Sequence, residues 1–423
     1  MNNNFNKQAL KNKLRLVTIP MKNTRAVTIL VLVGTGSKYE TKNINGISHF
    51  LEHMFFKGTK NKPTTLDIAE SLDQVGGQFN AFTGKECTGY WAKLNKKHID
   101  IGIDWVSDVL INSLFDPKEI EREKGVVIEE INMYLDTPRS YISNIWDQLL
   151  YKNQPAGRSI LGEKEIIGKM KRKEFINYLN NHYTSPNTVV VVAGNIDKNI
   201  KEKIEQKFKD LKQTKPKEKQ KTKEKQTKPE LLINYKKTDQ THLRIGVRAY
   251  NLFHKDKYAL DVLSTILGGG MSSRLFIDVR ERQGLGYYVF SSTQKETDVG
   301  NFFTQAGIDN KRVEKAIKII LENYKKLKEE KIEEKELKKA KEHIKGKAIL
   351  KMEESDEVAA FYGFQELLTK KTLTLEEKFN KIDSVTAEDI QRVAKDIFQP
   401  NKLNLCLIGP FKNKEKFKKL LKI

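Results

Sequence analysis

The stretch His49–His53 reads HFLEH, and the apolar residues MFF follow it directly. On a helix, positions i, i+3 and i+4 lie on one face, so His49, Glu52 and His53 converge on one point. Two imidazoles at this spacing can both reach a zinc ion, and the carboxylate between them can reach the water on that ion. The stretch therefore predicts a zinc-binding helix with Glu52 as general base.

The alternative for this stretch is a surface helix with two neutral histidines and a solvated glutamate. The flanking residues argue against it, because Phe50, Leu51 and Met54 make the helix apolar nearly all round. A helix of this kind is buried. Buried histidines and a buried glutamate need partners, and a metal ion provides them.

A third zinc ligand is expected, because catalytic zinc sites usually have three protein ligands and one open position. The segment Ile120–Ile131 reads IEREKGVVIEEI and offers four glutamates. One face of a helix over this segment carries Glu123, Val126, Val127 and Glu130. We favour Glu130 as the third ligand and Glu123 as the carboxylate that orients a ligand. Taken alone, the segment could equally be an ordinary acidic helix.

Length and composition limit the classes of protein to consider. A chain of 423 residues suits two domains of about 200 residues each. The formal net charge of +22 could indicate binding to nucleic acid, to an anionic membrane or to acidic ligands. The excess is mainly scattered lysine, however, which favours a solvated surface.

Cysteine usage and the N-terminus bear on the compartment. Cys87 and Cys406 lie in different halves and form no CxxC pair, which indicates a reducing environment without a disulfide framework. No apolar run approaches the roughly 20 residues of a spanning helix. The segment 1–11 has neither the apolar stretch of a secretory signal nor the arginine pattern of a presequence, so we expect a cytoplasmic protein without a membrane partner.

The segment Lys212–Pro229 reads KQTKPKEKQKTKEKQTKP and marks the domain boundary. It has no large apolar residue to bury, so we expect a solvated linker. The predicted domains are 1–211, which carries the zinc site, and 230–423.

Helix-like and strand-like runs alternate without a strict βαβ order, which predicts the α+β class. The expected strands are Leu14–Ile19, Val27–Val33, Cys87–Leu94, Val189–Val192, Leu243–Val247, Tyr287–Ser291 and Asn301–Ala306. The expected helices are Gly46–Phe56, Thr65–Val75, Ile99–Ser113, Lys118–Tyr134, Arg172–Asn180, Tyr258–Leu267, Ser272–Arg282 and long helices within Lys311–Lys351. Each half places a glycine-rich turn after a helix, so the halves could be distant copies of one fold.

Several motifs together resemble one family. They are HFLEHMFFKGT at 49–59, GGQFNAFT at 76–83, ECTGY at 86–90, the Glu121–Glu130 segment, GGGMSSRLF at 268–276 and RERQGLGY at 280–287. HxxEH is the reversed form of the HExxH zincin motif. The sequence resembles the pitrilysin, insulysin and mitochondrial processing peptidase superfamily over nearly the whole chain, and most of all its two-domain, processing-peptidase-like branch.

The resemblance implies two similar domains, each a mostly antiparallel sheet packed with helices. It also implies that Glu130 is the third ligand and Glu123 its supporting carboxylate. Gln78–Thr83 would be an edge strand beside the metal, with Asn80, Ala81 and Phe82 binding the backbone of an extended peptide. For Asn80 alone, a turn residue is an equally good reading.

The resemblance further matches Arg280 and Tyr287 to a pair that binds the substrate carbonyl or stabilises the oxyanion. Read alone, they could be a surface arginine and a core tyrosine. No second HxxEH occurs, so one Zn²⁺ per chain is expected.

The function expected on these grounds is a zinc metalloendopeptidase that acts on short or unfolded peptides, as a homodimer or with a related subunit. One alternative is a non-catalytic scaffold or partner of the same fold, which a degraded metal motif would favour. The other is a basic nucleic-acid binder, which would show lysines and aromatic residues along one groove, or a recognised motif. The sequence shows neither, so no nucleic-acid partner is expected.

Overall fold

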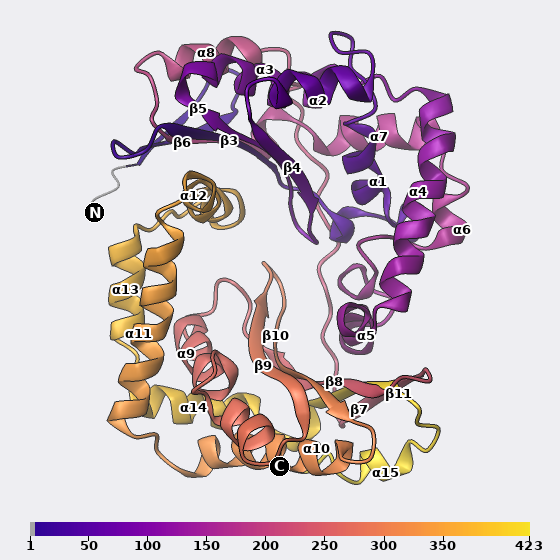
Figure 1. Ribbon diagram of the computed structural model, residues 1–423, viewed down its shortest axis with the longest axis vertical. Helices are drawn as coiled ribbons and strands as arrows, with labels where there is room; N and C mark the ends of the chain where they lie inside the picture. The colour runs from indigo at the N-terminus through magenta and orange to yellow at the C-terminus, as the bar shows by residue number, and fades with distance from the viewer. Residues whose placement is uncertain (1–4) are drawn as a thin grey trace. The chain divides into compact units, whose positions relative to one another are not determined.

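The structure is a computed structural model that describes residues 5–423, and they form two compact units (Figure 1). The first unit comprises the chain up to Asn132 with Arg158–Gln220 and Ile349–Thr374, and the second comprises Met133–Gly157, Lys221–Ala348 and Leu375–Ile423. The units differ from the predicted domains in two segments, because 133–157 belongs to the second unit and 349–374 to the first. Composition locates a linker, but it does not show which sheet a distant helix covers.

The first unit is built on a six-stranded sheet. Its strands are β1 (Asn6–Ala9), β2 (Arg15–Pro20), β3 (Ala26–Val33), β4 (Gln78–Thr83), β5 (Thr88–Asn95) and β6 (Thr188–Gly194). Its helices are α1 (Ile47–Met54), α2 (Thr65–Asp73), α3 (Ile99–Ile111), most of α4 (Pro117–Asp136), α6 (Lys164–Ile167), α7 (Arg172–His182), α8 (Ile200–Lys207) and α12 (Ser355–Thr369). The strand order is β1-β2-β6-β3-β5-β4, with β2 and β6 parallel and the other pairs antiparallel.

Alternation along β3 buries both faces of this sheet. Leu30 and Leu32 pack with Val358 and Tyr362 of α12. Ile29 points to the other face, where it lies against Gly102 of α3. Both layers of helices are therefore held by the period-two pattern of one apolar strand.

The second unit is built on a five-stranded sheet. Its strands are β7 (Glu230–Tyr235), β8 (Gln240–Ala249), β9 (Gly286–Lys295), β10 (Gly300–Asp309) and β11 (Leu403–Gly409). Its helices are α5 (Pro138–Tyr151), α9 (Lys257–Gly268), α10 (Val313–Glu329), most of α11 (Glu334–Lys351), α13 (Leu375–Asp383), α14 (Ala387–Ile397) and α15 (Glu415–Lys418). The helix expected over Ser272–Arg282 is present as a shorter π-helix over Phe276–Glu281.

The two sheets share one topology. The order β7-β11-β8-β10-β9 places the first, last, second, fourth and third strands side by side, as β2-β6-β3-β5-β4 does. In both sheets only the first and last strands pair in parallel. The fold is α+β with two mixed, mostly antiparallel sheets, so the prediction of two similar folds is confirmed.

The second sheet is also covered on both faces. Leu243, Ile245 and Val247 of β8 belong to a core that includes residues of α9, α10 and α14. The opposite face packs against α5, whose Trp146 donates a hydrogen bond to Asn301 on β10 at 3.0 Å. α5 thus covers the second sheet as α12 covers the first (Figure 1).

Two other sequence-based predictions concern the linker and membrane-spanning helices. The segment 212–229 has no helix or strand and is mostly exposed, as predicted. Among residues 5–423, no helix is both long enough and apolar enough to cross a membrane.

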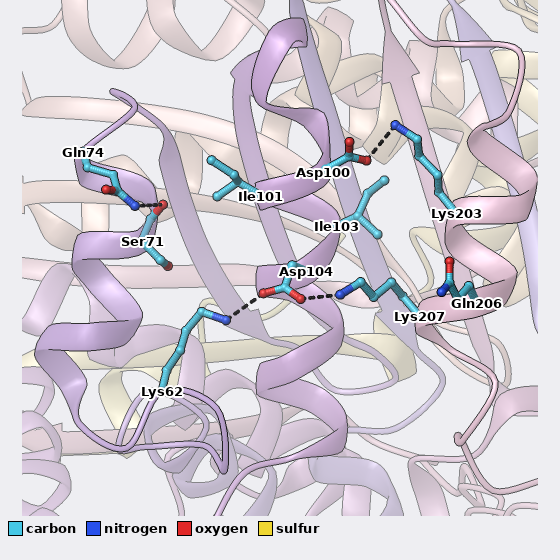
Figure 2. A pocket seen from close by; sticks show the side chains of 10 residues that line it. All are labelled: Lys62, Ser71, Gln74, Asp100, Ile101, Ile103, Asp104, Lys203, Gln206 and Lys207. Atoms are coloured by element: carbon cyan, nitrogen blue, oxygen red, sulfur yellow. Dashed lines mark hydrogen bonds and ion pairs between the residues drawn. The ribbon is translucent and has the colours of Figure 1, made fainter.

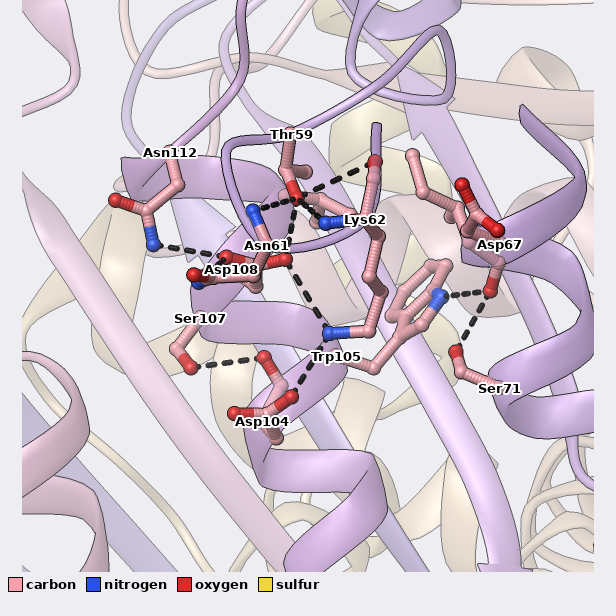
Figure 3. A network of polar contacts seen from close by, with 12 residues as sticks. Thr59, Asn61, Lys62, Asp67, Ser71, Asp104, Trp105, Ser107, Asp108 and Asn112 are labelled. Carbon is pink, nitrogen blue, oxygen red and sulfur yellow. Dashed lines mark hydrogen bonds and ion pairs between the residues drawn. The ribbon is translucent and has the colours of Figure 1, made fainter. Parts of the chain in front are cut away.

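A buried aspartate anchors the loop that follows α1. Asp108 accepts hydrogen bonds from the side chains of Thr59, Asn61 and Asn112 at 2.6, 2.6 and 2.8 Å, and Lys62 Nζ lies 3.2 Å from it (Figure 3). Burial acts to raise the pKa of Asp108, but these partners outweigh it and hold that pKa below its ordinary value of 3.8. α3 therefore fixes the path of the chain between α1 and α2.

An adjacent pocket between α2, α3 and α8 has its charges paired internally (Figure 2). Asp104 pairs with Lys62 at 2.8 Å and with Lys207 at 2.5 Å, and Asp100 pairs with Lys203 at 2.7 Å. These pairs tie α8 to α3.

We expect Asp108→Ala to lower the free energy of unfolding by about 3 kcal/mol, because it leaves the buried hydroxyl of Thr59 without its acceptor and also removes the acceptor of Asn61 and Asn112. The side chain of Asp108 is 2% exposed, whereas that of Asp100 on the same helix is 72% exposed. Asp100→Ala is the matched control and should change little. Urea unfolding compares the variants, and equal midpoints for Asp108→Ala and the wild type would refute the anchoring role.

Candidate metal centre

α1 begins at a glycine that no other residue could replace without strain. Gly46 has φ +95°, and a Cβ there would lie 2.7 Å from Gly162 Cα and from Leu161 O. The buried carboxylate of Glu40 caps the first turn by accepting hydrogen bonds from the backbone N–H of Gly46 at 2.7 Å and of Ser48 at 2.9 Å. Burial raises the pKa of Glu40, and these hydrogen bonds act against the rise. The start of the histidine helix is thereby fixed in position.

The ligand atoms of His49, His53 and Glu130 converge on one point. The two Nε2 atoms are 3.3 Å apart. Oε2 of Glu130 lies 3.3 Å from Nε2 of His49 and 3.2 Å from Nε2 of His53. α1 supplies both imidazoles and α4 supplies the carboxylate.

This triangle of donor atoms fits zinc. Ligand atoms at tetrahedral positions about 2.0–2.1 Å from Zn²⁺ are roughly 3.3–3.4 Å from one another. The three separations of 3.2–3.3 Å match that spacing, and two imidazoles with one carboxylate are a donor set that zinc accepts.

The electrostatics of the metal-free cluster also favour a cation. Burial alone would lower the pKa of His53, but hydrogen bonds to Glu123 and Glu130 outweigh it and raise that pKa to about 9. The hydrogen bonds from His49 and His53 hold the pKa of Glu130 well below its ordinary value of 4.5. The cluster therefore attracts positive charge, which a divalent ion among the three atoms would supply.

Glu123 supports one of the two imidazoles. Its Oε1 lies 2.9 Å from Nδ1 of His53, and its Oε2 lies 2.7 Å from Nζ of Lys57. Such a carboxylate fixes the tautomer of a ligating histidine, so that Nε2 is free to bind metal. Nδ1 of His49 has no such partner among the described residues. Glu123 contacts His53 directly, and its role as the supporting carboxylate stays a prediction.

Glu52 faces the strand beside α1. The hydroxyl of Thr83 donates a hydrogen bond to Oε2 of Glu52 at 2.5 Å. Glu52 is half-buried and lies on the same helix as both histidines, between them in sequence. A carboxylate held in this way has one fixed orientation, which a general base requires.

The strand that carries Thr83 is at the edge of the first sheet, as the resemblance implied. β4 pairs with β5, and no strand of residues 5–423 pairs with its other side. Asn80 is exposed within β4, so its reading as a turn residue is wrong. Ala81 and Phe82 follow in the same strand, and the ring of Phe82 packs against Phe364 of α12.

Arg280 and Tyr287 lie together in the second unit. Arg280 is the last residue but one of the π-helix, and its Cζ is 5.6 Å from the centre of the Tyr287 ring. Tyr287 is 71% exposed, so the reading as a core tyrosine is wrong. The pair is available to a ligand at the start of β9.

One sequence-based inference about α4 is wrong. Val126 was expected on the same buried face as Val127 and Glu130, but it is 49% exposed. The buried residues of α4 are Ile120, Glu123, Val127 and Ile131, which form a stripe too narrow to include Val126.

The sequence analysis did not assign roles to Glu40, Thr83 or Lys57. Each acts on α1 or Glu123 through a contact that local spacing does not reveal. Thr83 belongs to the motif GGQFNAFT at 76–83. Its position at the end of an edge strand beside α1 was the one signal in the sequence that pointed to a role for it.

The equivalent helix of the second sheet has no metal-binding set. In sequence, α9 lies between β8 and β9, as α1 lies between β3 and β4, but its sequence KYALDVLSTILG contains no histidine or cysteine.

The fold and this centre define the chain as a member of the M16 peptidase family. Residues 15–164 match the family model described as "Insulinase (Peptidase family M16)", and residues 169–344 match "Peptidase M16 inactive domain". The second match covers much of the unit whose α9 has no metal ligands.

Relatives of nearly full length are named as zinc proteases. An uncharacterized zinc protease of Bacillus subtilis, YmxG, is 38% identical over 95% of this chain and 98% of its own length. An uncharacterized zinc protease of Streptomyces coelicolor is 31% identical over 95% of this chain and 89% of its own. The crystal structure of a protease from Helicobacter pylori superposes with a TM-score of 0.89 at 25% identity, and covers 96% of this chain and 100% of that one.

Proposed function

We propose that this protein is a zinc-dependent endopeptidase that hydrolyses short or unfolded peptides. The observation that carries the proposal is the convergence of His49, His53 and Glu130 at zinc-like separations, with Glu52 on the helix that carries both histidines. The names of the homologues as zinc proteases support it.

His49, His53 and Glu130 would hold the ion. When bound, zinc supplies Lewis acidity and an acidified water. Glu52 takes the proton of the attacking water and passes it to the leaving amine. The hydroxyl of Thr83 keeps the carboxylate of Glu52 aligned for both transfers.

The substrate would bind as an extra strand. The free side of β4 offers backbone N–H and C=O groups to an extended peptide, with Asn80, Ala81 and Phe82 along it. Backbone pairing of this kind needs an extended chain, so folded proteins are poor substrates. Arg280 and Tyr287 would hold the scissile carbonyl, because a guanidinium and a phenol both donate to oxygen.

Cleavage of an unstructured, internally quenched peptide tests the proposal. Purified full-length protein should cleave the peptide at an internal bond, stop after treatment with a chelator, and recover when zinc is returned. Full cleavage by protein shown to be metal-free would refute the proposal.

The carbonyl-binding pair can be tested without disturbing the metal. We expect Tyr287→Phe and Arg280→Ala to lower kcat/KM by about 10²–10³-fold, the typical effect of losing one oxyanion donor. Zinc content should stay at the wild-type level, because both residues lie in the other unit. Arg282→Ala, an exposed arginine that pairs with Asp278, is the control. Wild-type kinetics in both variants would remove the pair from the site.

A further inference from the structure

A pocket of about 400 Å³ in the second unit has two arginines and no acidic residue in its lining. It lies where the first turns of α5 meet β8, β9 and β10. The lining residues that matter are Arg139, Ser140, Ser143, Arg244, Phe290 and Gln305.

Arg244 is buried in this pocket and held rigidly. It is 5% exposed, and its Cζ lies 3.9 Å from the centre of the Phe303 ring. Its Nε donates to Oε1 of Gln305 at 2.9 Å, and one terminal nitrogen donates to the hydroxyl oxygen of Ser143 at 2.7 Å.

The other terminal nitrogen of Arg244 has no partner. This atom, Nη1, is buried without a hydrogen bond. No carboxylate of residues 5–423 lies within 4.0 Å of the guanidinium, although the charge of Asp147 acts on it from farther away. Burial lowers the pKa of Arg244 to about 10, so the group still carries its charge at neutral pH. A buried, unpaired donor on a charged group is costly unless a ligand satisfies it.

Arg139 adds a second unpaired charge. Its Cζ lies 4.5 Å from the centre of the Tyr288 ring, and its guanidinium donates no hydrogen bond to any residue of 5–423. Its backbone oxygen accepts a hydrogen bond from Gln305, the residue that also positions Arg244. One glutamine thus sets the spacing of the two arginines.

The rest of the lining also suits an anion. Ser140 and Ser143 are three residues apart on α5 and share one face. The hydroxyl of Ser143 accepts from Arg244, so its proton is available to a ligand. The positive end of the α5 dipole adds to the field of both arginines. The pocket shown in Figure 2 differs from this one, because its lysines are paired with aspartates.

We propose that this pocket is an oxyanion-binding site that takes a carboxylate or phosphate group between Arg139 and Arg244. Guanidinium groups bind both with paired hydrogen bonds. The source is either the carboxylate of a peptide or a free phosphate. The site is independent of the zinc chemistry, and its binding does not require turnover.

Isothermal titration calorimetry of the full-length protein at fixed ionic strength tests this site. The probes are inorganic phosphate, an N-acetylated dipeptide with a free C-terminal carboxylate, and the C-terminal amide of the same dipeptide. The variants are Arg139→Gln, which changes an exposed side chain, and Arg244→Lys, which keeps a charge but loses the fork. Arg312→Gln, an exposed arginine outside the pocket, is the control for net charge.

We expect saturable binding that weakens by about tenfold or more in Arg139→Gln and Arg244→Lys and is unchanged in Arg312→Gln, because each of the first two variants loses a charged hydrogen bond to the anion. Binding of the free carboxylate but not the amide identifies a peptide terminus as the source, and binding of phosphate alone identifies a free phosphate. Absence of saturable binding of every probe, or equal binding by the wild type and Arg139→Gln, overturns the proposal. Neither of these results depends on peptidase activity, so the anion site and the proposed peptidase function can be refuted separately.

Discussion

Glu52→Gln is expected to retain zinc and to lose peptide cleavage by about 10²–10⁴-fold, the usual contribution of a general base. The amide has nearly the shape of the carboxylate but does not accept the proton of the attacking water. The three atoms at the metal centre belong to His49, His53 and Glu130, so the exchange leaves the ligand set unchanged.

Steady-state kinetics and elemental analysis on the same preparation of Glu52→Gln provide the measurement. Glu70→Gln on α2, an exposed glutamate away from the centre, is the matched control and should behave as the wild type. Wild-type turnover by Glu52→Gln would show that another group takes the proton.

The second large effect concerns the ligands themselves. We expect His53→Ala and Glu130→Gln to lose most of their zinc, and therefore cleavage, because two protein ligands bind zinc far more weakly than three. His53→Ala also removes the hydrogen-bond partner of the buried Glu123. Elemental analysis after dialysis against a weak chelator measures the loss.

Glu129→Gln is the control for Glu130→Gln. Glu129 is the neighbouring residue with the same charge, but it is exposed and accepts a hydrogen bond from Asn132. It should keep zinc and activity. Equal zinc retention by both glutamine variants would mean that Glu130 is not a ligand.

The metal centre could be predicted from the sequence because helical geometry places its residues. The spacing of His49, Glu52 and His53 needs only the period of one helix, and the spacing of Glu123 and Glu130 needs only that of another. The helical periods of α1 and α4 do not show that these two helices face each other. The family resemblance supplied it, and the atom separations are consistent with it.

The supporting contacts around α1 could not be predicted, because each joins segments that the sequence does not align. Glu40 reaches the helix start through a loop, and Asp108 holds the loop after the helix from α3. The residues next to Glu40 and Asp108 in sequence do not indicate these contacts. The exposure of Val126 could not be predicted either, since a helical period indicates which side of a helix is buried but not how wide the buried side is.

The fold class was predictable, whereas the assignment of helices to sheets was not. β3 and β6 are recognisable from their apolar runs. The apolar face of α5 indicates that it is buried, but it does not indicate that the helix covers the second sheet rather than the first. The same holds for α12, which lies between β10 and β11 of the second sheet in sequence and packs on the first.

We propose that His49, His53 and Glu130 hold a zinc ion that peptide cleavage requires. Zinc content and cleavage rate can be measured together on full-length protein loaded with zinc to different extents. We expect about one zinc per chain at full loading, and a rate that rises in proportion to bound zinc. Full cleavage by a sample in which no metal is detected would contradict it.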